Sequence, residues 1–201
     1  MAQEEGGSLS EVRARVGASH GITELAHKQH FYECWAPDCD KDVAVLQYRA
    51  PRLAVDCLAQ ALSGPPQTAL ILDAARGTGL VAAELQARGF LQLHGVDGSP
   101  GMLEQAQGRG LYQHLSLCTL GQEPLPSPKG RLVCLTTRTN LSNLQYKEAL
   151  EAAPDRLEQS REWEHLVAWP ADRWELATSK LEAVPGTSDS DGFISSIIYL
   201  Y

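Results

Sequence analysis

Apolar residues recur at helical spacing through the first third of the chain. They predict two or three helices, and Ser10 is placed to cap the first of them. The last helix is expected over residues 43–62, with Pro51 as a break or a restart. The turn-rich segment SGPPQT follows at 63–68. We therefore predict an N-terminal helical segment over residues 1–64.

Short apolar runs alternate with helical patterns after residue 65. The run ALILD at 69–73 is continuous, which is typical of a strand buried on both faces of a parallel sheet. The order strand, helix, strand, helix, strand predicts an α/β sheet with right-handed crossovers. This α/β domain is expected over 65–201 and forms one globular unit with the helices. Its further elements are strands at 91–97 and 115–120, a helix at 80–88 and another that begins at Ser99 and Pro100.

A break in this pattern follows the third strand. GQEPLPSPKG at 121–130 holds three prolines and two glycines, and a strand at 131–137 comes directly after it. Parallel neighbours are usually joined by about a dozen or more residues that include a helix. An element that the pattern requires is therefore absent here. Beyond it we predict an amphipathic helix over 143–163 and a C-terminal antiparallel hairpin of residues 174–181 and 193–201.

Composition and charge narrow the classes of function. The 201 residues include 25 acidic and 17 basic side chains, a net charge of −8, which disfavours nucleic-acid binding. No apolar run approaches the roughly 18 residues that span a bilayer, and the N-terminus resembles no signal or transit peptide. A cytoplasmic location without membrane contact is therefore expected. Five irregularly spaced cysteines without a C-x-x-C indicate neither a disulfide framework nor a metal site.

The candidate ligand-binding residues follow the first two predicted strands. Asp73 ends the first, and a turn with Gly77 and Gly79 leads into a helix whose positive dipole end can meet a ligand. Asp97 ends the second, where a carboxylate can accept hydrogen bonds from a ribose diol. With Ala82 the glycines also fit G-x-G-x-x-A, so NAD(P) or FAD is an alternative ligand. Asp73 would oppose a pyrophosphate there and favour the ammonium group of S-adenosylmethionine.

Several segments resemble class I S-adenosylmethionine-dependent methyltransferases. D-x-x-x-G-T-G and FYECWAPDCDKDV carry the resemblance, and YRAPRLAVD, ARGFLQLHGVDGSPGMLEQA and LTTRTNLSNLQYKEALE are similar to a methyltransferase-like group in that class. The resemblance implies a Rossmann-like sheet of order 3-2-1-4-5-7-6 with strand 7 antiparallel. It also implies S-adenosylmethionine as cofactor, with Asp73 at its methionine end, Asp97 at its ribose and Met102 at its adenine. The expected cofactor-binding residues are Asp73, Ala75, Gly77, Thr78, Gly79, Asp97, Gly98, Ser99, Met102, Thr119 and Leu120.

The chain departs from that family pattern in several places. Arg76 stands where a small residue or Cys is usual, and a long cation there would crowd the cofactor or repel its sulfonium. Cys39 stands where Tyr is common. The acid often found after strand 3 is absent, and Thr119 and Leu120 lie there instead. By the same resemblance, the segment absent after residue 130 corresponds to strand 4 and its helix, so the chain resembles a splice variant or a mis-joined gene model.

The expected function is that of an S-adenosylmethionine-dependent methyltransferase whose acceptor is an unknown small molecule or protein. Without strand 4, we expect its activity to be weakened or lost. Tyr32 and Trp35 are expected on the acceptor side. The alternatives are a non-catalytic module that binds S-adenosylmethionine, S-adenosylhomocysteine or a protein, and an NAD(P)-binding oxidoreductase. Neither a catalytic base nor an oligomeric state follows from the residues.

Overall fold

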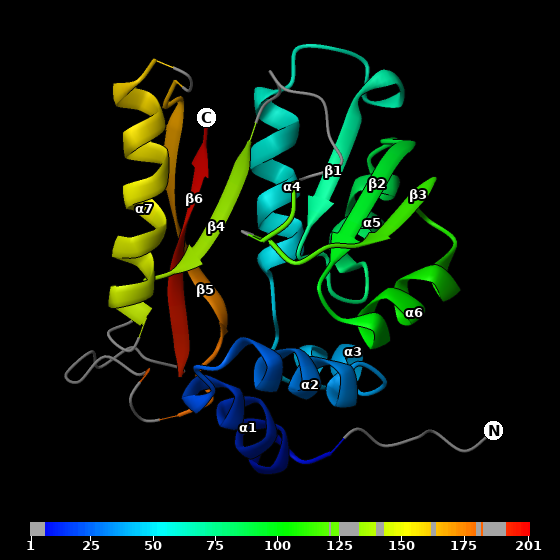
Figure 1. The fold of residues 1–201 in the computed structure, drawn as a ribbon, viewed down its shortest axis with the longest axis vertical. Coiled ribbons are helices and arrows are strands. Elements are labelled where there is room, and N and C mark those ends of the chain that lie inside the picture. Colours follow the sequence, from blue (N-terminus) through cyan, green and yellow to red (C-terminus); the bar gives the residue numbers. More distant parts are fainter. Residues whose placement is uncertain are drawn as a thin grey trace.

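Two three-stranded sheets lie side by side with helices packed around them, and the N-terminal helices run below both sheets (Figure 1). The computed structural model describes residues 7–120, 122–124, 133–139, 143–161, 164–179, 182 and 192–201. Parts of five predicted segments lie outside these residues, namely those at 1–64, 121–130, 131–137, 143–163 and 174–181.

The first sheet is parallel and confirms the predicted alternation of strands and helices. Ser99 caps the second crossover helix, Pro100 occupies its first turn, and Gly110 ends it with a φ of 66°. This is the usual asymmetry of proline at a helix start and glycine at its end. The elements are β1 (Leu70–Ala74), α5 (Leu80–Ala87), β2 (Gln92–Asp97), α6 (Pro100–Arg109) and β3 (His114–Leu117), in the sheet order β1-β2-β3.

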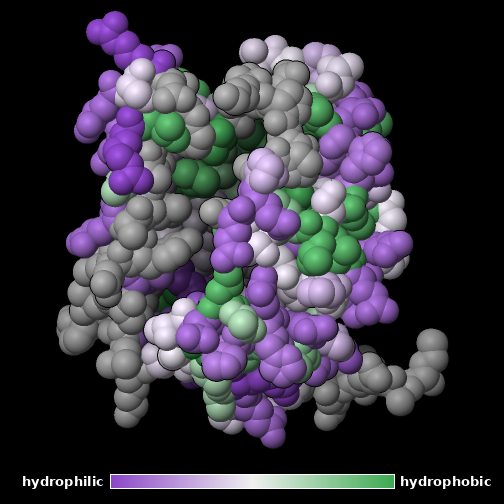
Figure 2. Space-filling view, viewed as in Figure 1, coloured by the Kyte–Doolittle hydropathy of each residue, from purple (hydrophilic) through white to green (hydrophobic). Residues whose placement is uncertain are grey.

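β1 is less buried than its apolar run predicts. Of its five residues only Asp73 is buried, while the three apolar residues before it are partly exposed. The reason is topological, because among the described residues β1 pairs with β2 alone and its other edge has no neighbouring strand. Leu117 and Leu120, at the end of β3 and just beyond it, are 55% and 45% exposed. Figure 2 shows hydrophobic residues at the surface on the face of the molecule that carries this sheet.

The second sheet is antiparallel, with β6 as its central strand. The implied order without strand 4 reads 3-2-1 and 5-7-6, and the two observed sheets have this arrangement when β4, β5 and β6 are counted as strands 5, 6 and 7. The described residues of β4 pair only with β6, so β4 has not moved beside β1 into the place of the absent strand. The elements are β4 (Cys134–Arg138), α7 (Leu144–Gln159), β5 (Val167–Leu176) and β6 (Phe193–Leu200).

The hairpin partner of β6 lies further upstream than the predicted strand at 174–181, which is a correction. Pro170 and the charged residues around it obscure β5 in the sequence, although an edge strand tolerates a proline. The register of β5 also shifts between Ala171 and Glu175, and Arg173 there has a φ of 55°. A strand with such a bulge does not show the simple alternation by which strands are recognised.

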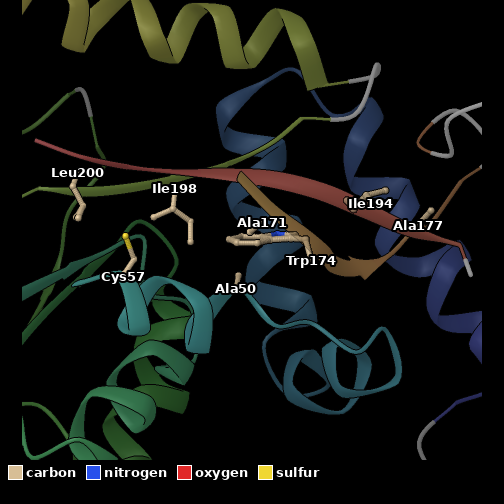
Figure 3. Close-up of a cluster of buried hydrophobic side chains, with 8 residues drawn as sticks. All are labelled: Ala50, Cys57, Ala171, Trp174, Ala177, Ile194, Ile198 and Leu200. Atoms are coloured by element: carbon tan, nitrogen blue, oxygen red, sulfur yellow. The ribbon is translucent and has the colours of Figure 1, made fainter. Parts of the chain in front are cut away.

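Helix α4 (Ala50–Ala61) lies between the two sheets, and its side chains belong to the hydrophobic clusters of both (Figure 1). Cys57 points toward Ile198 of the second sheet, within a cluster that also contains Trp174 (Figure 3). Val55, on another face of the helix, belongs to a second cluster with Leu93 of β2. One helix therefore joins two sheets that share no backbone pairing among the described residues.

The N-terminal helices lie at the end of the first sheet toward which β1 points (Figure 1). Ser8, and not the predicted Ser10, caps the first helix. The Ser8 hydroxyl accepts from the N–H of Glu11, whose carboxylate in turn accepts from the N–H of Ser8. Pro51 lies in the first turn of α4, so it restarts the helix as expected. The division of the chain at residue 64 stays a prediction. The remaining elements are α1 (Leu9–Gly17), α2 (Leu25–Trp35), α3 (Cys39–Val45) and the 3-10 turns Ala18–Gly21 and Pro66–Thr68.

Candidate functional site

Residues 75–79, here called the glycine turn, connect β1 to α5 through left-handed backbone. Ala75, Gly77 and Gly79 have φ values of 53°, 57° and 94°. A Cβ at Gly79 would also lie 3.2 Å from the Tyr112 ring, so this position suits glycine for two reasons. The turn places the amino end of α5 beside the carboxyl end of β1, where a ligand can meet free backbone N–H groups.

Asp97 is bonded to the glycine turn. Its Oδ2 accepts from the N–H of Gly77 at 2.8 Å, and its Oδ1 accepts from the N–H of Ser99 at 2.8 Å. Ser99 also caps α6, because its hydroxyl accepts from the N–H of Met102. Each carboxylate oxygen has two acceptor positions, so the half-buried carboxylate keeps capacity for two further donors. The structure therefore brings together the predicted residues after β1 and after β2.

Asp73 is buried at the end of β1, with its carboxylate directed at Tyr112. The Tyr112 hydroxyl donates to Oδ2 at 2.7 Å. Burial raises the pKa of Asp73 to about 6, while the Tyr112 bond and Arg76 lower it. The predicted contact of Asp73 with an ammonium group stays a prediction, because the carboxylate here is engaged by Tyr112.

Arg76 lies inside the protein and does not extend into solvent. It is 4% exposed, and its Nη1 donates to the carbonyl of Gly77 at 2.8 Å and to that of Met102 at 3.4 Å. Its aliphatic part covers Gly95 of β2, where a Cβ would lie 2.4 Å from the Arg76 Cδ. Burial lowers the pKa of the guanidinium. The side chain thus ties the glycine turn to the first turn of α6.

The other predicted cofactor-binding residues, Met102, Thr119 and Leu120, lie in different surroundings. Met102 is 2% exposed and packs against Ala36 and Cys39 of the N-terminal segment. Thr119 accepts at its hydroxyl from Gln29 of α2 at 3.2 Å, and the same amide donates to the carbonyl of Gly98 at 3.3 Å. The structure therefore joins Thr119 to the loop after β2 and covers Met102, whereas Leu120 is 45% exposed.

Comparison with known proteins assigns the family. A family described as a methyltransferase domain matches residues 71–160, which contain the glycine turn and Asp97. Methyltransferase-like protein 27 of Homo sapiens is 67% identical, over 90% of this chain and 86% of the human protein. The chain belongs to the methyltransferase family. Neither comparison supports the oxidoreductase alternative.

The alignment with the human relative also shows a difference in length. It runs over 211 positions, which is more than the 201 residues of this chain. Ninety per cent of 201 is about 181 residues, so about 30 aligned positions of the relative have no counterpart here. A strand with its helix occupies roughly this length.

The N-terminal helices of the methyltransferase contact the glycine turn through residues that the sequence reasoning did not assign. Asp40 of α3 accepts from the Thr78 hydroxyl at 2.5 Å and also pairs with Arg109 of α6. Gln29 reaches the loop after β2, as described above. Asp40 lies in the segment WAPDCD, which carries part of the family resemblance, so the sequence does contain a signal for it. Tyr112 and Gln29 carried none.

The predicted acceptor-side residues belong to the same helical layer. The Trp35 indole N–H donates to Asp42 at 2.8 Å, so its polar edge points into the protein. Tyr32 is half-buried beside it, with ring centroids 6.0 Å apart, and burial raises its pKa. Cys39 is buried in this layer as well, and burial raises the pKa of its thiol to about 12. Among the residues described, these aromatic groups line neither the cavity between α4 and β5 nor the one beside α6 and β3.

A second polar cluster lies where β4 and β5 approach the N-terminal segment. Arg138 pairs with Glu175 at 2.6 Å and with Glu182 at 3.2 Å, and both carboxylates are nearly fully buried. His20 lies 3.3 Å from Glu182. Burial raises the pKa of Glu175, and Arg138 opposes that rise. The cluster holds the N-terminal segment against the second sheet, and no sequence pattern had joined these residues.

The described residues include no helix that is long and apolar enough to cross a membrane. Within the same ranges, no group of three or more His, Cys, Asp or Glu side chains is placed to hold a metal ion. All five cysteines are free thiols.

Proposed function

We propose that this methyltransferase binds S-adenosylmethionine at the edge formed by the glycine turn and Asp97, and that it donates the methyl group to a small molecule or protein. The observation that carries the proposal is the position of the Asp97 carboxylate. Two backbone N–H groups orient it at the end of β2, and one of them belongs to Gly77. The family membership supports the same ligand.

The residues of this edge have the hydrogen-bonding groups and the accessible backbone that such a ligand requires. Asp97 has acceptor capacity for a ribose diol, and the positive φ of Gly77 and Gly79 lets a ligand approach the backbone. The glycine turn and the loop after β2 also contain the other predicted residues of this region, namely Ala75, Thr78, Gly98 and Ser99. When bound, S-adenosylmethionine supplies an electrophilic methyl group. Displacement at that methyl requires alignment more than acid–base help, so the chain's task is to hold the donor and exclude water.

A second candidate function is that of a non-catalytic module that binds S-adenosylmethionine or S-adenosylhomocysteine. The outer edge of β1, which has no neighbouring strand in the described part of the chain, favours it, because ligands of open α/β sheets bind where the strand order reverses. About 30 positions of the human relative are absent from this chain, the length of one strand and its helix. Loss of that unit would remove one wall of the site. We therefore expect donor binding to survive better than methyl transfer.

Binding and transfer are tested separately. Thermal shift with S-adenosylmethionine, S-adenosylhomocysteine and NAD in parallel should show stabilisation by the two sulfur compounds only. Stabilisation by NAD alone would overturn the proposal. Incubation of a cell extract with the donor carrying a radiolabelled methyl group then decides between the two functions, since label transfer indicates an enzyme and binding without transfer indicates a module. The cytoplasmic location stays a prediction, which fractionation of cells would test.

A further inference from the structure

Arg76 is almost completely buried, and only part of its hydrogen-bonding capacity is used. Nη1 donates to two carbonyl oxygens, whereas Nε and Nη2 are buried and have no hydrogen-bond partner among the described residues. The guanidinium makes no ion pair with a described carboxylate, and Asp97 and Asp73 act on it only by longer-range attraction. A buried charge with unmade hydrogen bonds is unfavourable, which points to an anionic group that completes those bonds.

The geometry of the free nitrogens indicates which anion fits. Nε and Nη2 form one edge of the planar guanidinium, the edge that binds a carboxylate through two parallel N–H···O bonds. The guanidinium lies against the glycine turn, because Nη1 donates to the carbonyl of Gly77. Helix α5 begins at Leu80, with Gly79 as its N-cap, and its amino end adds positive potential beside the guanidinium.

Tyr112 contacts both the Arg76 guanidinium and the Asp73 carboxylate, so a cation and an anion lie on either side of its ring and hydroxyl. Its hydroxyl donates to Asp73 at 2.7 Å, and its ring centroid lies 5.4 Å from the Arg76 Cζ. An α-amino acid group has the complementary charges, a carboxylate for Arg76 and an ammonium for Asp73. S-Adenosylmethionine and S-adenosylhomocysteine both carry such a group at one end and a nucleoside at the other.

We propose that Arg76 binds the α-carboxylate at the amino-acid end of the donor. This inference rests on the proposed binding of S-adenosylmethionine and adds a specificity-determining residue to it. The nucleoside end is assigned to Asp97 and makes no use of Arg76. Arg76 therefore distinguishes ligands that possess the amino-acid end from those that lack it.

Calorimetric titration with two ligands tests the assignment. S-Adenosylhomocysteine has the amino-acid end, and 5′-methylthioadenosine lacks it. In Arg76→Ala, binding of S-adenosylhomocysteine should weaken roughly 10- to 100-fold, while binding of 5′-methylthioadenosine stays unchanged. Arg76→Lys keeps the positive charge but cannot form two parallel hydrogen bonds to a carboxylate. Its affinity for S-adenosylhomocysteine should therefore lie between those of the natural chain and of Arg76→Ala. Arg52→Ala, on the exposed side of α4, is the matched control and should behave as the natural chain does.

The alternatives give different results. Tighter binding of both ligands to Arg76→Ala would mean that the guanidinium obstructs the site, and equal weakening of both would mean that it only supports the turn. Either result overturns the inference and leaves donor binding intact. If the natural chain binds neither ligand, the proposed function itself fails. Binding of 5′-methylthioadenosine shows that a variant is folded, and Arg76→Gln replaces Arg76→Ala if the latter does not fold.

Discussion

The Thr78 hydroxyl donates to the Asp40 carboxylate at 2.5 Å, and this bond joins α3 to the glycine turn. Arg109, in the last turn of α6, donates to the same carboxylate and to the carbonyl oxygen of Thr78. One carboxylate of the N-terminal segment therefore supports the glycine turn twice, directly at Thr78 and through Arg109. The helices before β1 are part of that support, although they lie outside the matched methyltransferase domain.

Asp40→Ala removes the acceptor for both side chains and leaves the Thr78 hydroxyl, in a residue only 3% exposed, without that partner. We expect the free energy of unfolding to fall by about 1–3 kcal/mol. Urea denaturation measures this change. Asp155→Ala, exposed on α7, should shift it by less than about 0.5 kcal/mol. A loss no larger than that of the control would contradict the supporting role of Asp40.

Asp97→Ala should abolish the thermal stabilisation by S-adenosylmethionine and S-adenosylhomocysteine, because the ribose acceptor is gone. Asp97→Asn keeps one oxygen acceptor, so a reduced shift is expected. Asp172→Ala, exposed on β5, serves as the control and should retain the full shift. An unchanged shift in Asp97→Ala would show that the ribose assignment is wrong.

Asp73 makes stability depend on pH. Its pKa of about 6 in the folded chain exceeds the ordinary value of 3.8, so between these values the folded state holds a proton that the unfolded state has released. The free energy of unfolding therefore decreases as pH rises from 4 to 6. Relative to Asp73→Asn, the natural chain should lose on the order of 2–3 kcal/mol between pH 4 and pH 7. Urea titrations of both proteins across this range measure the difference, and parallel pH profiles would exclude the effect.

Two glycines should respond to alanine in opposite ways. At Gly95 a Cβ would lie 2.4 Å from Arg76 and 2.8 Å from Tyr112, so Gly95→Ala should destabilise the chain by about 1–3 kcal/mol. At Gly108, in α6, no atom lies within 4 Å of the added carbon, and alanine should stabilise by about 0.5–1 kcal/mol. Urea denaturation of the two variants measures their free energies of unfolding relative to the natural chain. In the background of Arg76→Ala the loss at Gly95 should shrink, and strict additivity would contradict the close approach.

The elements of the first sheet could be predicted because their signals are local. The run 69–73 ends in an acid, a glycine turn follows, and proline and glycine mark the two ends of α6. β5 could not be placed in the same way. Its proline and its bulge interrupt the alternation, and only pairing with β6 makes it a strand. The exposure of β1 likewise depends on a neighbour that no local pattern describes.

In the candidate site, too, some features follow from local sequence patterns and others depend on residues distant in the sequence. Asp97 and Gly77 follow consecutive parallel strands, so their proximity follows from topology, and the structure brings them together. The path of Arg76 depends on Tyr112 and on the bare backbone of Gly95, which are distant in sequence. The sequence therefore predicted a cation in the turn but not that it would be buried with two nitrogens unused.

Helix α4 has a consequence for how the chain unfolds. Its opposite faces supply side chains to the cores of both sheets, so melting either half removes the surface against which the other is ordered. Denaturant should then produce one transition for the whole polypeptide. The cooperativity of this chain is carried by side chains of the twelve-residue α4 and of the N-terminal helices, in place of the backbone ladder that a continuous sheet would provide.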